Sequence, residues 1–243
     1  MLRNIKLEIE YDGTNFYGWQ IQPKLRTVQG EIQEKLETIL GHEVNLIGAG
    51  RTDVGVHALG QVANFKTTSE LDQNSIVNGL NGLLPDDIVI KRIEEVDLNF
   101  NSRYSARSRL YKYRIHLRRT AVLRNYVWEV LYSLNLENIF QATKKIEGKH
   151  DFSSFCVAES IKDNNVCQVF SAIWEKSKDE LIFKIEADRF LHTMVRSLVG
   201  TFIEVGRGYF SVSDFVNIVE AKDRKRAGPT APACGLYLVE VKY

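Results

Sequence analysis

Residues 109–117 read Arg-Leu-Tyr-Lys-Tyr-Arg-Ile-His-Leu, and this alternating stretch decides how the rest of the chain divides. Successive side chains of an extended strand point to opposite faces. One face therefore holds Tyr111, Tyr113, Ile115 and Leu117. The other face holds Lys112, Arg114, His116 and Arg118. The stretch predicts a strand that is apolar on one side and basic on the other.

A set of strands and helices precedes this strand. Residues 4–11 alternate between apolar and polar types, which is typical of a strand. Thr27 is suited to cap an amphipathic helix that runs through Val28 and Ile32 to Leu40. The remaining elements predicted here are strands at 44–47, 62–65 and 88–93 and a helix at 72–82.

A second set of strands and helices follows the strand at 109–117. Residues 126–131 indicate a strand and residues 136–147 an amphipathic helix. A hairpin around Lys178-Asp179 joins strands at 169–174 and 181–186. The later elements are helices at 190–205 and 212–221 and a strand at 236–241. The order predicts an α+β fold with two halves, residues 1–105 and residues 106–243.

Composition and cysteine use indicate an intracellular, soluble protein. The chain has 243 residues, of which 44% are hydrophobic and 26% charged. Its N-terminus lacks the apolar region of a signal peptide, and no apolar run is long enough to cross a bilayer. Cys156, Cys167 and Cys234 form no C-x-x-C pair, so neither a disulfide framework nor a thiolate zinc site is indicated. We expect a cytoplasmic protein with three reduced thiols and no membrane association.

Positive charge is concentrated although the net charge is only +1. Between Asp97 and Glu129 there is no acidic residue. The cations of this stretch are Arg103, Arg107, Arg109, Lys112, Arg114, Arg118, Arg119 and Arg124. A second cluster comprises Lys222, Arg224, Lys225 and Arg226. Such clusters suit the phosphate backbone of a nucleic acid, and a solvated surface of strands and loops is the alternative.

Glycine and alanine surround one Arg-Thr-Asp sequence at residues 48–58, Gly-Ala-Gly-Arg-Thr-Asp-Val-Gly-Val-His-Ala. Small residues of this kind suit a backbone that another molecule approaches closely. In an extended segment Arg51 and Asp53 point to the same side, where the guanidinium would keep the carboxylate ionised. An ionised, oriented carboxylate suits a nucleophile or general base. An ordinary salt bridge in a turn is the alternative.

A metal site is the weaker interpretation of the histidines. His57 lies four residues after Asp53, and Asp188 and His192 are possible further ligands. No H-x-x-x-H or similar spacing supports a metal, so we expect none. A structural hydrogen bond of His57 within its loop is the preferred interpretation.

Two further segments carry polar groups in apolar surroundings. The predicted helix from Phe190 is apolar around most of its circumference, yet it contains His192 and Arg196 four residues apart. A buried arginine needs a carboxylate, a phosphate or water, and a structural ion pair would also serve. Residues 11–20, Tyr-Asp-Gly-Thr-Asn-Phe-Tyr-Gly-Trp-Gln, form an aromatic loop that either stacks on RNA or packs.

Together these segments resemble one family, the tRNA pseudouridine synthases that act on the anticodon arm. The matching stretches are YDGTNFYGWQ at 11–20, AGRTDVGVHA at 49–58, RLYKYRI at 109–115, FLHTMVRSLVG at 190–200 and APACGLYLVEV at 231–241. They occur in the family's order and span nearly the whole chain. The stretch AGRTD-x-GVHA is the most specific of them.

The resemblance implies that the chain isomerises uridine to pseudouridine at tRNA positions 38, 39 and 40, without a metal or an organic cofactor. By resemblance Asp53 is the catalytic aspartate and Tyr111 stacks on the flipped uracil. Arg51 braces Asp53 or fills the gap in the RNA stack, and Arg196 is a second cation near the carboxylate or backbone. The basic strand suggests RNA contacts by Arg107, Arg109, Lys112 and Arg114.

The resemblance also implies an architecture. It comprises two ferredoxin/RRM-like halves with mainly antiparallel sheets, joined around a central basic cleft, in a homodimer that binds tRNA across both subunits. One departure is visible, because many relatives carry an arginine where this chain has Cys167. Two other functions are open: a non-catalytic RNA-binding protein on the same scaffold, and a metal-dependent phosphohydrolase using Asp53, His57 and His192.

Overall fold

The structure is a computed structural model that describes residues 1–157, 160 and 164–243. It confirms the α+β class, with helices packed on mostly antiparallel strands. The chain divides into two compact units. The first comprises Met1–Arg107 and Tyr237–Tyr243, and the second comprises Ser108–Leu236. The last strand thus clusters with the first unit, whereas the sequence pattern counts it in the second half.

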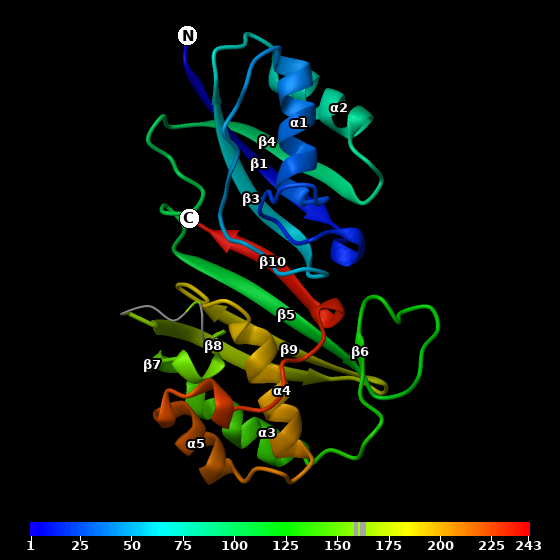
Figure 1. Cartoon of the computed structure of the whole chain (residues 1–243), viewed down its shortest axis with the longest axis vertical. Coiled ribbons are helices and arrows are strands. Elements are labelled where there is room, and N and C mark those ends of the chain that lie inside the picture. The colour runs from blue at the N-terminus through cyan, green and yellow to red at the C-terminus, as the bar shows by residue number, and fades with distance from the viewer. Residues whose placement is uncertain (158–159, 161–163) are drawn as a thin grey trace. The chain divides into compact units, whose positions relative to one another are not determined.

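The first unit is a sheet with two helices on one of its faces (Figure 1). Its strands are β1 (Arg3–Tyr11), β2 (Ile47–Gly48), β3 (His57–Thr67), β4 (Ile88–Val96) and β10 (Leu236–Lys242). The order is β4-β1-β3, and both β2 and β10 pair with β3. Strand β10 is parallel to β3, and the other pairs are antiparallel. The order of β4, β1, β3 and β2 is that of a ferredoxin-like βαββαβ unit.

The helices of this unit follow from local sequence. Helix α1 (Val28–Leu40) begins after Thr27, whose side chain accepts the Gly30 N–H as predicted. Helix α2 (Gln73–Leu83) begins after Asp72, whose carboxylate accepts from Ser75. The core combines alternate residues of β1 with the apolar stripes of both helices, which removes their surface from water. Its fully buried members include Ile5, Leu7, Ile9, Ile32, Leu36, Ile76 and Leu80.

The second unit has a sheet of order β5-β9-β8-β7, with short β6 parallel to β5. Its strands are β5 (Ser108–His116), β6 (Trp128–Glu129), β7 (Gly148–Asp151), β8 (Val166–Lys176) and β9 (Glu180–Ala187). Its helices are α3 (Leu136–Thr143), α4 (Met194–Gly206) and α5 (Val212–Ala221). The predicted hairpin around Lys178-Asp179 is confirmed, because β8 and β9 pair antiparallel across it.

An aromatic cluster fills the core between the second sheet and its helices. Trp174 and Phe183 lie with ring centroids 4.8 Å apart, and Phe183 meets Phe202 of α4 at 5.5 Å. Phe202 then stacks on Phe215 of α5 at 4.9 Å. Such ring pairs add to the stability that area burial provides. The cluster holds α4 and α5 at fixed positions on the sheet.

Several of the predicted elements differ in extent, among them the strand predicted at 62–65, which spans His57–Thr67. The strand predicted at 44–47 is only Ile47–Gly48, and the strand predicted at 126–131 is only Trp128–Glu129. The helix predicted from Phe190 begins at Met194, because Thr193 adopts a left-handed conformation with φ of 62°. His192 therefore precedes the helix. Within the described residues, none of the helices combines the length and apolar character that crossing a bilayer requires.

Candidate functional site

Asp53 lies in the loop between β2 and β3, and its side chain is partly exposed. The Val56 N–H donates to the Asp53 carbonyl at 3.2 Å, and Gly55 follows with φ of 76°. Gly55 therefore occupies a conformation that residues with a Cβ rarely adopt. The glycine turns the chain sharply behind Asp53, so the carboxylate stands at the edge of a tight turn.

The aromatic loop at residues 11–20 packs directly against the Asp53 loop. The Trp19 N–H donates to the Thr52 carbonyl at 3.1 Å, and the Gly55 N–H donates to the Phe16 carbonyl at 3.3 Å. The Tyr11 hydroxyl and the Thr52 hydroxyl lie 2.7 Å apart in a buried hydrogen bond. Burial raises the pKa of Tyr11, so the phenol stays neutral and hydrogen-bonded. Two motifs distant in sequence thus form one structure.

Close backbone approaches explain why glycines recur in these loops. A Cβ on Gly18 would lie 2.6 Å from the Thr52 carbonyl oxygen, and Gly18 itself has φ of 82°. A Cβ on Gly48 would lie 2.5 Å from the Trp19 ring. Gly50 differs, because a Cβ there would have nothing within 4 Å. Protein packing therefore accounts for Gly18 and Gly48 and leaves Gly50 beside open space.

Arg51 is exposed, and a hydrogen bond to Gln20 orients its side chain. Its Nε donates to Oε1 of Gln20 at 3.0 Å. The role predicted for Arg51, bracing Asp53 or filling the gap in the RNA stack, stays a prediction. Buried Gln61 donates to the Gly50 carbonyl at 2.9 Å. Neither glutamine was singled out from the sequence, because Gln61 lies just before the predicted strand at 62–65.

His57 is a structural residue of this loop, as preferred from the sequence. It is buried, and the Gly13 N–H donates to its Nδ1 at 3.1 Å. Its ring stacks on Tyr237 of β10 with centroids 4.7 Å apart. Among the described residues there is no group of three or more His, Cys, Asp or Glu side chains suited to hold a metal ion.

Tyr111 lies on β5 of the second unit, on the face that the pattern predicts. It is 8% exposed and meets the edge of Phe190 with ring centroids 5.0 Å apart. Tyr113 is fully buried, and its hydroxyl donates to the Pro232 carbonyl at 2.7 Å. Burial raises the pKa of Tyr113 well above its usual range. The interpretation of Tyr113 as a core residue is confirmed.

The basic residues of β5 divide between two faces of the sheet. Arg109 shares the face of Tyr111, and its Nη1 donates to the Asp188 carbonyl at 2.7 Å. Lys112 and Arg114 point to the opposite face, where Arg114 pairs with Glu180. Burial lowers the pKa of Lys112. Arg107 is exposed and belongs to the first unit, where its N–H donates to the Lys242 carbonyl.

Arg196 lies in the first turn of α4 and is partly buried. Its Nε donates to the Ala231 carbonyl at 2.8 Å, and the Ala231 N–H donates to the Arg196 carbonyl at 3.1 Å. This reciprocal pair fastens residues 228–231 to the start of the helix. The sequence showed no sign of it, because backbone acceptors have no residue signature.

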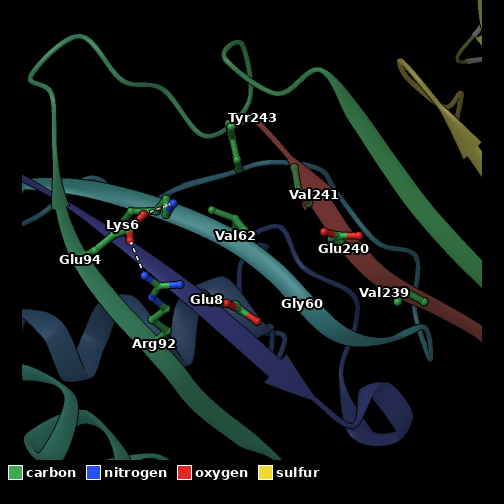
Figure 2. Close-up of a pocket in the computed structure, with 10 residues that line it drawn as sticks. All are labelled: Lys6, Glu8, Gly60, Val62, Arg92, Glu94, Val239, Glu240, Val241 and Tyr243. Atoms are coloured by element: carbon green, nitrogen blue, oxygen red, sulfur yellow. Dashed lines mark ion pairs between the residues drawn. The ribbon is translucent and has the colours of Figure 1, made fainter.

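Cys167 is buried in β8, and burial raises its pKa to about 11. A thiol in this state is neutral and does not bind phosphate as an arginine would. A cavity lies elsewhere in the first unit (Figure 2). It is lined by charged residues of β1 and β4, including Lys6 and Glu94, beside Tyr243. None of the predicted site residues lines it.

Comparison with known proteins gives one consistent family. A family model described as tRNA pseudouridine synthase matches residues 8–105 and 142–243. The matched ranges include Arg51, Asp53 and Arg196, whereas Tyr111 lies between them. The chain is 47% identical over 244 residues to the tRNA pseudouridine synthase A of Caldicellulosiruptor saccharolyticus, with 100% of each chain covered. The corresponding proteins of a Thermoanaerobacter species and of Acetivibrio thermocellus are 44% and 46% identical, again over 100% of both chains.

Proposed function

Because the chain belongs to the tRNA pseudouridine synthase family, we propose that it isomerises uridine to pseudouridine at positions 38, 39 and 40 of the tRNA anticodon stem-loop. The observation that supports this most is the loop of Asp53. It is a tight turn, clamped by the aromatic loop, that presents one carboxylate at its edge. A rigid backbone holds a reacting group in the geometry that catalysis needs.

The reaction is an isomerisation with balanced atoms. The bond between N1 of uracil and C1′ of ribose breaks, the base rotates, and a bond between C5 and C1′ forms. The hydrogen of C5 leaves as a proton, and N1 gains a proton. No electron is transferred to or from an outside group, so side chains that hold charge and move protons suffice.

We assign Asp53 as the catalytic residue. An ionised carboxylate can attack the base, attack the sugar or remove a ribose proton. Each of these routes requires the carboxylate to reach a uridine that has left its stack, which costs a few kcal/mol. The open space beside Gly50 suits the close approach of such a nucleotide to the loop.

Tyr111 and Arg196 supply the other groups that a flipped uridine needs. We propose that Tyr111 stacks on the uracil ring, which is a sequence-independent way to hold an unpaired base. This proposal is supported by the position of Tyr111 on the apolar face of β5, where the Phe190 ring packs edge-on against it. We propose that Arg196 is a second cation near the Asp53 carboxylate, and that Arg51 braces this carboxylate or fills the gap left in the RNA stack.

Among the four basic residues predicted to contact RNA, we propose phosphate contacts for Arg109 and Arg107. Arg109 has the best position, because it shares the strand face of Tyr111. Arg107 is exposed and suited to a backbone contact. Lys112 and Arg114 face the other side of the sheet, so contacts from them require RNA on that surface.

We further propose that the protein acts in the cytoplasm as a homodimer that binds tRNA across both subunits. Sedimentation equilibrium of the purified protein tests the dimer, which should persist at micromolar concentration. A monomer at the concentrations where the enzyme is active would refute it.

Tritium release tests the reaction against the rival of a non-catalytic RNA-binding protein. Transfer RNA carrying tritium at C5 of uridine should lose one tritium to water for each pseudouridine formed. Sequencing of pseudouridine in the product should place it at positions 38, 39 and 40. Binding without release would favour the rival, and pseudouridine elsewhere would refute the proposed positions.

A further inference from the structure

The chain carries a basic turn, Lys222–Arg226, that the proposed chemistry does not use. Helix α5 ends at Ala221, and Lys222 follows in a left-handed conformation with φ of 52°. Arg224–Arg226 then form a 3-10 turn. The left-handed residue bends the chain away from the helix axis, and the side chains of Lys225 and Arg226 are exposed.

Side-chain contacts hold the basic turn in one conformation. The Asp223 carboxylate accepts the Lys225 N–H at 2.9 Å. The Asp223 N–H donates to Oγ of Ser154 at 2.9 Å. The Lys222 ammonium pairs with Asp151 of β7 at 3.3 Å. Lys225 and Arg226 are therefore displayed on a fixed backbone, which reduces the entropy lost when a partner binds.

The basic turn has an excess of positive charge. Its four cations are opposed by Asp151 and Asp223, which leaves two positive charges in excess. Arg224 is held by neutral acceptors, the Gly228 carbonyl at 3.0 Å and the Thr230 hydroxyl at 2.8 Å. Lys225 and Arg226 make no ion pair in the ranges that the structure describes. Cations without carboxylate partners fit a polyanion such as a phosphate backbone.

The segment at residues 228–231 connects the basic turn to Arg196, because it packs on helix α4. The Gly228 N–H donates to the Thr201 hydroxyl of α4 at 3.0 Å. A Cβ on Gly200 would lie 1.7 Å from the Pro229 carbonyl oxygen, so the segment after the turn lies flat on the helix. Three residues after Gly228, the Ala231 carbonyl accepts a hydrogen bond from Nε of Arg196. Ala231 is the fifth residue after Arg226, so the two are at most about 18 Å apart.

We propose that Lys225 and Arg226 bind phosphates of the substrate tRNA within a few nucleotides of the target uridine. This inference rests on the proposed function, because only that function places Arg196 beside the target. The basic turn would then anchor the RNA strand that leaves the site, while Arg196 acts at the reacting nucleotide. The contact is with the backbone, so it is independent of the RNA sequence.

The test compares two double variants that remove the same charge from the second unit. The first is Lys225→Ala with Arg226→Ala. The control is Lys144→Ala with Lys145→Ala, an exposed pair at the end of α3. Affinity for an anticodon stem-loop RNA is measured over a range of salt concentrations. We expect the slope of log affinity against log salt to fall by about 1.5 in the first variant, since each phosphate contact contributes roughly 0.7–0.9. The control should keep the wild-type slope.

Kinetics give a second measurement. In about 0.1 M salt we expect KM of the first variant to rise roughly tenfold, about threefold per contact, with a smaller change in kcat. An unchanged slope, an equal loss in the control, or an effect seen on full-length tRNA but not on the stem-loop would overturn the proposal. A glutamine double variant at the same positions replaces the alanine variant if that variant melts early. If the wild-type protein binds RNA but releases no tritium, the proposed function fails. The salt dependence of RNA affinity in the two double variants still decides whether Lys225 and Arg226 contact phosphates.

Discussion

Replacing Gly18 with alanine tests whether the aromatic loop holds the backbone of the Asp53 loop in place. Gly18 has φ of 82°, and a Cβ there would lie 2.6 Å from the Thr52 carbonyl oxygen and 3.2 Å from the Asp53 carbonyl carbon. A Cβ essentially never lies this close to backbone. The Thr52–Asp53 segment must therefore move when the methyl group is added.

Two costs can be assigned to Gly18→Ala. The left-handed conformation costs a residue with a Cβ about 1–2 kcal/mol. Relief of the backbone contact adds about 1–3 kcal/mol, as overpacking does elsewhere. Gly41→Ala is the matched control, because Gly41 has φ of 72° but nothing within 4 Å of the added Cβ. The control has only the first cost, so the difference between the variants measures the contact.

We expect Gly18→Ala to lower Tm by roughly 6–12 °C, for a loss of about 3 kcal/mol in a chain of this size. Tritium release at 25 °C, well below Tm, should fall at least about tenfold, because a small displacement of a positioned group costs much of the rate. Gly41→Ala should keep wild-type release. Equal Tm values for the two variants, with full activity in both, would refute the view that Gly18 positions Asp53.

Four further substitutions separate the roles of individual residues. Arg196→Ala should lower kcat about a hundredfold while tRNA affinity changes less than threefold, since Arg196 is assigned to the reacting carboxylate; a loss mainly in affinity would make it a phosphate contact. Arg109→Ala should flatten the salt dependence of tRNA affinity by about 0.7–0.9, whereas Arg114→Ala, on the opposite strand face, should leave it unchanged; the reverse pattern would place RNA on the other surface. Gly50→Ala should change the free energy of unfolding by less than about 1 kcal/mol, because its Cβ meets no protein atom. It should nevertheless raise KM severalfold if RNA approaches that backbone, and a wild-type KM would exclude the approach.

Local signals predicted much of the fold. Thr27 caps α1 as its side chain predicts, and the Lys178-Asp179 turn joins β8 to β9. Alternation along residues 109–115 gave the correct buried face, including the fully buried Tyr113. These features depend on neighbours within a few residues, so a single sequence contains them.

Features that depend on distant residues were not predictable in the same way. The pairing of β10 with β3 joins Tyr237 to His57, and no residue pattern marks such a partner. The start of α4 was placed too early, because the apolar pattern from Phe190 runs through Thr193, whose left-handed conformation is set by its surroundings. The contact of Arg51 with Gln20 also joins residues 31 positions apart, and no local pattern marks it.

In the candidate site, too, local sequence predicted some features, and contacts with distant residues determine the others. The proposed role of Asp53 rests on one specific motif, and the structure adds how Thr52 and Gly55 hold its loop. The contacts that fix the loop come from residues 11–20, whose role was open between stacking and packing. Tyr11, Phe16 and Trp19 are nearly fully buried and pack, whereas the ring of Tyr17 is 50% exposed.

The most direct test of the central assignment is tritium release by Asp53→Asn, measured beside tRNA affinity and Tm. The amide has the shape of the carboxylate but lacks its charge and its nucleophilic oxygen. We predict that release falls below detection under single-turnover conditions, while tRNA affinity and Tm stay close to those of the wild type. Release at a rate near that of the wild type would contradict the assignment of Asp53 as the catalytic carboxylate.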